Sequence, residues 1–343
     1  MIDALVAFII AFFIALFATP GCRWLAMRTG AVAIPGERSV HSKPMPYLGG
    51  LAIAAGFGGA LLLAGRGNFP WLPVLVGGFF ILLLGILDDI VCLRPWVKLL
   101  GQVVGASMLY VGGVQIGYIT NPLGGLFLLG WLALPITLTW VVGVINVVNL
   151  SDGLDGLAAG ISSIAALTLL YVAWQQGQPE VAIVAAALGG STLGFLPHNF
   201  NPARIFMGDG GSMFIGFILA AIAMQGTLKS TAAIALLIPF LALGLPMFDA
   251  IFAVLRRAAN GRPIYEADGG HLHHRLLHMG MSQRQVVVSM YLGSLFLGSS
   301  AALMTALDPR HGGLLMVTVI GLMLALGKKV GILEIKQEKD IQH

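Results

Sequence analysis

The sequence predicts an all-α polytopic membrane protein with about 11 transmembrane helices, and three observations lead to this fold class. Hydrophobic residues make up 57% of the 343 residues and charged residues only 10%, whereas a soluble domain carries about 25% charged residues. The mean hydropathy is +0.90. Apolar runs close to the roughly 20 residues of a membrane span recur along the whole chain. We therefore expect one integral membrane domain over residues 1–343, with 328–343 as a short cytoplasmic tail.

Each apolar run predicts one helix, and three of the runs carry a further signal. Asp3 and the lack of a preceding basic residue mark the first run as a retained span rather than a cleavable signal peptide. Pro135 interrupts the fifth run, so a kink is expected there. Pro239, Gly244 and Pro246 predict a bend in the ninth. The expected spans are 3–19, 48–65, 70–87, 97–113, 123–145, 157–174, 180–197, 211–227, 230–252, 285–306 and 312–327.

The basic residues predict the orientation. With the N-terminus outside and the C-terminus cytoplasmic, 16 of the 19 Lys and Arg lie inside, leaving Arg66, Lys229 and Arg310 outside. The net charge of +4 is then a topogenic signal and requires no nucleic-acid partner. Cys22 and Cys92 fall on the cytoplasmic side, where a disulfide is not expected.

The same orientation brings the unusual polar stretches to the cytoplasmic face, where it predicts a catalytic cleft. They span residues 37–44, 87–98, 146–156, 198–212 and 256–278. Their acidic members are Asp88, Asp89, Asp152, Asp155 and Asp209. Five carboxylates at one interface would repel one another, and a divalent cation would offset that repulsion. Oxygen ligands with few His or Cys favour Mg²⁺, with Mn²⁺ as the alternative, over zinc.

The stretch "INVVNLSDGLDGLAAG" (145–160) places a polar residue at every third position: Asn146, Asn149, Asp152 and Asp155. A helical turn would set neighbours of this series side by side, although Gly153 and Gly156 suggest an irregular turn. No Lys or Arg in this stretch neutralises the carboxylates. A plain solvated turn is the alternative interpretation.

Two further acidic motifs lie at expected helix ends. Glycines surround Asp209 in "MGDGGS" and predict a tight turn that opens a helix, where free N–H groups favour phosphate. Asp209 could instead only cap that helix. Asp88 and Asp89 follow the third span and could form a simple polar stop.

The motif "HLHHR" (271–275) has three interpretations. A helix would place His271, His274 and Arg275 on one side. They could donate hydrogen bonds to phosphate, ligate a transition metal, or contact anionic lipid. Asp249 is expected to be a structural partner of a nearby Arg.

Together, "NVVNLSDGLDGLAAG", "RIFMGDGGSMFIGF", "ADGGHLHHRL" and "DDIVCLRPWVK" resemble the polyprenyl-phosphate N-acetylhexosamine-1-phosphate transferases. The resemblance covers nearly the whole chain, and the His motif is similar to the GlcNAc branch. It implies transfer of a sugar 1-phosphate from a UDP-N-acetylhexosamine, most simply UDP-GlcNAc, to undecaprenyl phosphate at the bacterial plasma membrane. The products are the lipid diphosphate sugar and UMP, with Mg²⁺ as the cofactor, in the first membrane step of envelope polysaccharide synthesis.

The resemblance also implies site residues. The expected metal ligands are Asp209 and Asn149. Asp152 and Asp155 resemble the acidic pair of the nucleotide pocket, with Asp155 nearest the uracil. The expected catalytic residues are Asp88, Asp89, Asp152, Lys98 and His271, and the expected substrate-binding residues are Asn146, Asp155, Lys43, His273, His274 and Arg275. Gly269, Tyr47 and Cys92 depart from the residues common at these positions in the family. These departures leave the identity of the sugar undetermined, but not the reaction.

A phosphate monoester is already largely ionised at neutral pH, so a strong general base is not obligatory. Asp88 is a candidate for taking the residual proton. The bend in the ninth span is expected to shape a groove for the lipid tail. A phospho-N-acetylmuramoyl-pentapeptide transferase, a UDP-sugar transporter, a prenyl-group transferase and a scaffold are the alternatives. The sequence leaves the oligomeric state open, with a homodimer as one option.

Overall fold

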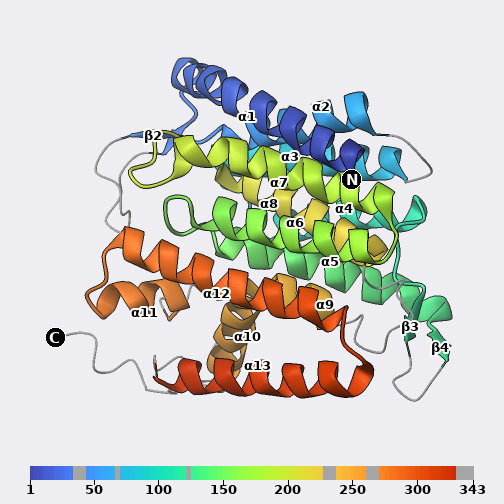
Figure 1. The fold of residues 1–343 in the computed structure, drawn as a ribbon. Coiled ribbons are helices and arrows are strands. Elements are labelled where there is room, and N and C mark those ends of the chain that lie inside the picture. The colour runs from blue at the N-terminus through green and yellow to red at the C-terminus, as the bar shows by residue number, and fades with distance from the viewer. Residues whose placement is uncertain (34–43, 66–69, 121–124, 227–236, 260–269, 330–343) are drawn as a thin grey trace.

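The computed structural model describes residues 1–33, 44–65, 70–120, 125–226, 237–259 and 270–329. Most helices run side by side in one bundle (Figure 1). Two small antiparallel ribbons accompany them, β1 (Val32–Ala33) with β2 (Met45–Pro46) and β3 (Tyr118–Thr120) with β4 (Leu126–Leu128). The expectation of a helical membrane protein is confirmed, with these ribbons as an addition that the hydropathy pattern did not indicate.

Eight helices in the described part of the chain are long and apolar enough to cross a membrane. They are α1 (Ile2–Thr29), α3 (Trp71–Val91), the 3₁₀ turn η1 (Gly130–Leu132) continuing into α5 (Ala133–Leu150), α6 (Leu157–Gln175), α7 (Pro179–Asn199), α8 (Gly208–Gly226), α12 (Gln283–Met304) and α13 (Pro309–Lys329). The other three expected spans correspond to the shorter α2 (Gly49–Ala64), to α4 (Pro95–Val111), and to a helix pair in place of the ninth.

The ninth expected span is broken into α9 (Leu237–Ala242) and α10 (Gly244–Ala259). Figure 1 shows α10 running across the direction of the other helices, between α12 and α13. The predicted bend is therefore confirmed. The short helix α11 (Leu272–His278) follows, and Ser282 then starts α12 with a capping box to Gln285.

The fifth span differs from its prediction. The apolar residues 126–128 form β4, and the helix begins only at Ala133, so Pro135 lies in its first turn, where proline is tolerated without a kink. The helix continues to Leu150, beyond the expected end at 145. Asn146 and Asn149 are consequently on its last two turns.

The most buried helix is α8, in which every residue from Gly210 to Gly226 is buried. It packs against α3 and α5, and also against α2, α6 and α7. Short connections (92–94, 151–156 and 200–207) join α3 to α4, α5 to α6 and α7 to α8. All three connections therefore emerge at the same end of the bundle, which is the end that carries the acidic motifs.

Candidate active site

Lys98 is the centre of a polar cluster built from four separate segments. Its Nζ lies 2.8 Å from Asp88 Oδ2 at the end of α3 and also contacts Asp209 Oδ2 at the start of α8. Asn149 Oδ1 on α5 is 3.4 Å from the same nitrogen. Residues 88, 98, 149 and 209 are thus brought together. The segments that meet here are distant in the sequence, since the neighbouring hydrogen bond from Gly210 N–H to Asp89 spans 121 positions.

Asp89 faces the beginning of α8. Its Oδ1 accepts the backbone N–H of Asp209 at 2.9 Å, and its Oδ2 accepts that of Gly210 at 3.3 Å. Gly208 has a φ of +71°, a conformation that favours glycine and turns the chain into the helix. The tight turn expected at "MGDGGS" is therefore present, and Asp89 satisfies two of the free N–H groups of the helix start.

The neighbouring Asp88 points to the other side of the helix end. Leu93 N–H donates to its Oδ1 at 2.8 Å, while its Oδ2 pairs with Lys98. Both oxygens of Asp88 therefore have partners. This arrangement holds the ammonium group of Lys98 beside Asp209.

Asn149 contributes to the cluster through both ends of its amide. Its Nδ2 donates to Asp209 Oδ1 at 2.8 Å and to Ser212 Oγ at 2.9 Å. Ser212, one turn after Asp209 on α8, was missed by the sequence analysis, and the serine in "MGDGGS" was the available signal. One turn earlier on α5, Asn146 Nδ2 donates to Gln102 Oε1 at 2.7 Å and to Val142 O at 2.8 Å. Asn146 therefore connects α5 to α4.

Asp152 and Asp155 lie in turns after the end of α5, not on a continued helix. Burial, together with the nearby carboxylates of Asp209, Asp89 and Asp155, raises the pKa of Asp152 to about 8. Asp155 has a different environment, since its Oδ2 accepts hydrogen bonds from Asn201 Nδ2 at 3.1 Å and from Ala203 N–H at 3.0 Å.

Gly156, which ends this turn segment, is held from two sides. Its N–H donates to Asn199 Oδ1 at 3.1 Å, and its carbonyl accepts from Tyr291 Oη at 2.5 Å. Neither Asn199 nor Tyr291 was a predicted site residue. "HNFNP" offered a signal for Asn199, whereas Tyr291 lies in an apolar span without any motif.

The histidine segment (271–275) packs beside the turns that carry Asp152 and Asp155. His271 is the N-cap residue of α11, and its Nδ1 lies 3.0 Å from Asp249 Oδ2. Asp249 Oδ1 also accepts Leu272 N–H at 2.8 Å. Asp249 was expected to partner an Arg, whereas the partners found here are His271 and this backbone N–H, which hold the start of α11.

His273 is buried against Gly153, where an added Cβ would come within 2.6 Å of its Nε2. Burial, with a smaller contribution from His274, lowers the pKa of His273 to about 4. The rings of His273 and His274 are 4.3 Å apart between centroids. Arg275 Nε donates to Gly270 O at 3.1 Å. Of the expected substrate-binding residues, Lys43 lies outside the described residues.

The donor chemistry of the cluster fits a hard divalent cation, because its ligating atoms are carboxylate and amide oxygens. Within the described segments, no three His, Cys, Asp or Glu side chains converge to form a complete protein-only metal shell. Mg²⁺ usually binds through one or two carboxylates plus substrate phosphates. Asp209, flanked by Lys98 and Asn149, meets that requirement.

Known proteins are similar to this chain over most of its length. Residues 71–227 match glycosyl transferase family 4. A probable undecaprenyl-phosphate N-acetylglucosaminyl 1-phosphate transferase of Bacillus subtilis is 41% identical over 309 residues, covering 89% of this chain and 86% of that protein. A decaprenyl-phosphate N-acetylglucosaminephosphotransferase of Mycobacterium tuberculosis is 38% identical over 340 residues, covering 89% and 83%.

A phospho-N-acetylmuramoyl-pentapeptide-transferase of Halalkalibacterium halodurans is 36% identical over 204 residues, covering only 58% of this chain and 61% of its own length. The matched family region contains Asp88, Lys98, Asn149, Asp152 and Asp209. The sequence similarity thus extends across the segments that form the polar cluster. The chain belongs to glycosyl transferase family 4.

Proposed function

We propose that this membrane protein transfers N-acetylglucosamine 1-phosphate from UDP-GlcNAc to undecaprenyl phosphate or a similar polyprenyl phosphate, on the cytoplasmic face of the bacterial plasma membrane. The convergence of Asp88, Lys98, Asn149 and Asp209 at one end of the bundle carries this proposal. The relatives named for GlcNAc 1-phosphate transfer match 89% of the chain, which favours this sugar over the muramoyl-pentapeptide.

The reaction joins two anions. A phosphate oxygen of the acceptor attacks the β-phosphorus of the UDP-sugar, a new P–O bond forms, and the bond from this phosphorus to the bridging oxygen breaks. The bridging oxygen leaves with UMP. Positive charge around the diphosphate is therefore the main requirement for catalysis.

Lys98 supplies that charge, and Asp88 and Asn149 keep its ammonium group in place. Bound Mg²⁺ supplies further positive charge to the diphosphate oxygens and to the leaving UMP. Asp209 and Asn149 would hold it, with Asn149 also orienting Asp209 through the 2.8 Å hydrogen bond. Asp89 fixes the backbone that carries Asp209.

The nucleotide and sugar are proposed to bind between the turns after α5 and the histidine segment. Asp152 faces the other carboxylates, and His273 packs on Gly153. Asp155 shapes the nucleotide side of this pocket through its bonds to the loop before α8. His271, His274 and Arg275 lie on the adjoining segment and remain proposed contacts of the diphosphate or sugar.

The acceptor tail is proposed to follow α10. An apolar cavity of about 350 Å³ lies between α10, α11, α12 and α13, and Phe248, Phe252 and Leu297 are among its lining residues. Asp249, whose side chain positions His271, also borders it. A tail in this cavity would therefore end near the histidine segment, where the phosphate is needed.

The deciding assay measures UMP release from purified protein with undecaprenyl phosphate, Mg²⁺ and a panel of UDP-N-acetylhexosamines that includes the muramoyl-pentapeptide. We expect release with UDP-GlcNAc and its loss in Asp209→Ala, while metal-free binding of UDP-GlcNAc persists. Asp308→Asn is the matched control, because Asp308 is an exposed residue that pairs with His311 before α13. Full activity of Asp209→Ala would reject the assigned role, and release with another sugar only would reject the specificity.

A further inference from the structure

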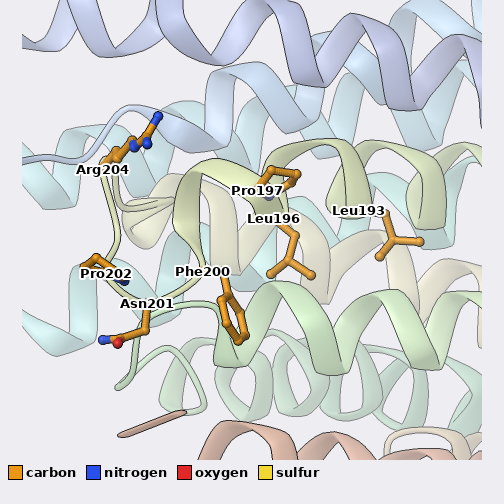
Figure 2. Close-up of a pocket in the computed structure, with 7 residues that line it drawn as sticks. All are labelled: Leu193, Leu196, Pro197, Phe200, Asn201, Pro202 and Arg204. Carbon is orange, nitrogen blue, oxygen red and sulfur yellow. The ribbon is translucent and has the colours of Figure 1, made fainter.

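A second hollow lies beside the last turns of α7 and the loop that follows it. It has a volume of about 590 Å³ and is lined by Leu193, Leu196, Pro197, Phe200, Asn201, Pro202 and Arg204 (Figure 2). None of the side chains of the Lys98 cluster lines it. It is therefore separate from the proposed reaction centre.

The lining changes character along the hollow. Leu193 and Leu196 belong to α7, one of the candidate membrane spans, and mark its apolar part. Arg204 lies at the opposite end, in the loop after the helix, where its backbone N–H donates to His198 O in the last turn of α7 at 2.8 Å. Figure 2 shows Phe200 between these two ends, with Asn201 below Arg204. Apolar side chains within the span and a cation just outside it have the same order as the acyl chain and headgroup of a membrane lipid.

The polar end of the hollow is positively charged. Arg204 is exposed, and among the residues that the structure describes no carboxylate forms an ion pair with it. Arg284 contacts the same loop, since its Nε donates to Asn201 O at 3.1 Å, but it does not line the hollow. An anionic group would complement the Arg204 guanidinium, whereas a zwitterionic or neutral headgroup would do so less well.

The polar end is also fixed before any ligand arrives. Asn201 Nδ2 donates to Gln283 Oε1 at 2.6 Å and to Asp155 Oδ2 at 3.1 Å. Ala203 N–H donates to the same carboxylate oxygen, so the Asp155 carboxylate already has partners in this loop. A site whose walls are held in place loses less conformational entropy on binding.

From these observations we infer that the hollow beside α7 binds an anionic phospholipid of the cytoplasmic leaflet, with the phosphate at Arg204 and an acyl chain along Leu193, Leu196 and Phe200. The occupant is a bilayer lipid, distinct from the polyprenyl acceptor assigned to the cavity beside α10. The charge complementarity and the apolar-to-cationic order of the lining support this assignment.

Native mass spectrometry of the full-length protein in detergent tests the inference by titration with phosphatidylglycerol and phosphatidylcholine of identical acyl chains. We expect wild-type protein to retain phosphatidylglycerol preferentially. Arg204→Gln should weaken that retention about fivefold, the equivalent of about 1 kcal/mol for one juxtamembrane cation. Arg204→Lys should restore most of it. Arg23→Gln is the matched control, because Arg23 is exposed on α1 and does not line the hollow.

Two further ligands test the remaining parts of the inference. Dihexanoyl phosphatidylglycerol should bind several-fold more weakly than the long-chain lipid, and equal binding would overturn the acyl-chain placement. Polyprenyl phosphate should not displace the retained phosphatidylglycerol, and displacement would assign the hollow to the acceptor instead. Equal losses in Arg204→Gln and Arg23→Gln, or equal retention of both phospholipids by wild-type protein, would overturn the site itself.

Discussion

Asp88 and Asp89 are adjacent in the sequence but have different partners. Successive residues on a helix point about 100° apart, so Asp88 faces Lys98 while Asp89 faces the N-terminus of α8. The sequence could place both carboxylates at a helix end. It could not separate their directions, because these depend on how α4 and α8 pack around α3.

Their different partners predict different effects of the same substitution. Asp89→Asn retains only one acceptor oxygen for two backbone N–H groups and should lose charge-assisted hydrogen bonds worth about 1.5–3 kcal/mol. Its melting temperature should fall by roughly 2–4 °C. Asp88→Asn should keep its melting temperature closer to that of wild type, because the lost pair with Lys98 is offset by relief of the repulsion between Asp88 and Asp209. It should lower kcat about tenfold or more, because Lys98 loses one of its two charged partners.

Thermal unfolding in detergent and UMP release at pH 6 and pH 8 check both variants. At pH 6 the acceptor is more protonated, so normal turnover of Asp88→Asn at this pH would exclude Asp88 as the acceptor of the residual proton. Equal losses of stability in the two variants would contradict the separate environments described above.

Asp152 and Asp155 are likewise close in the sequence but have different environments in the structure. The pKa of Asp152 is raised to about 8 in the folded, metal-free protein, compared with about 3.9 in an unfolded chain. Between these values the folded state holds a proton that the unfolded state has released. Stability should therefore fall as the pH rises from about 4 through 8 in the absence of divalent cations.

Asp152→Asn removes the carboxylate that must ionise and should raise the melting temperature at pH 8.5 without metal, by roughly 2 °C or more, while UMP release is lost. Asp155→Asn is the comparison and should lower the melting temperature, because Asn201 and Ala203 lose a charged acceptor. Melting curves from pH 5 to pH 8.5 with EDTA measure both effects. A pH-independent difference between Asp152→Asn and wild type would contradict the raised pKa.

At the scale of helices, hydropathy predicted where the spans lie better than where they end. Pro135 suggested a kink inside the fifth span, but it lies in the first turn because the preceding apolar residues form β4. Asn149 lies on the helix itself because Asp209 and Ser212 give its amide partners. Such partners come from another helix, and no local pattern in the sequence reveals them.

The ninth span illustrates a reliable local signal. Pro239, Gly244 and Pro246 weaken helix continuity, and the chain does break between α9 and α10. The direction of α10 was beyond the sequence, because it depends on contacts with α5 and α12. The apolar cavity beside α10 follows from that direction.

Filling this cavity tests its proposed use by the acceptor tail. Gly293 on α12 lines it, and a Cβ there would meet only Leu245 Cδ atoms, the nearer at 3.3 Å. Gly293→Leu should raise KM for polyprenyl phosphate several-fold and leave KM for UDP-GlcNAc unchanged. Its stability should not fall, because leucine favours a helix over glycine by about 0.8–1 kcal/mol.

Gly143→Leu is the control, since no other atom lies within 4 Å of a Cβ at that position on α5. Both KM values and the melting temperature are measured for each variant. Unchanged acceptor kinetics in Gly293→Leu would place the tail elsewhere, and a matching rise of KM for UDP-GlcNAc would indicate a distorted reaction centre.

At the scale of the whole molecule, the alternation of spans explains how distant motifs meet. The connections after α3, α5 and α7 all emerge at one end of the bundle, so residues 88, 149 and 209 become neighbours. The basic-residue count predicted which motifs share a side. It could not predict distances, and only the packing of α8 against α3 and α5 brings Asp209 within reach of Lys98 and Asn149.

Sidedness itself can be measured with cysteine chemistry. Cys92 is exposed directly after α3 at the end of the bundle that carries the reaction centre, and Cys22 is half-buried. Arg310 is exposed at the beginning of α13, at the opposite end of the helices. In a Cys22→Ala background, a membrane-impermeant maleimide should label Cys92 in inside-out vesicles but not in intact spheroplasts. Arg310→Cys, made in a Cys22→Ala/Cys92→Ala background, should show the reverse, because the positive-inside rule places the basic end in the cytoplasm. Labelling of both positions from the same side would contradict the arrangement of the helices in the bundle. An exchange of the two patterns would leave that arrangement intact but reverse its orientation in the membrane. The reaction centre would then be separated from a cytoplasmic supply of UDP-GlcNAc.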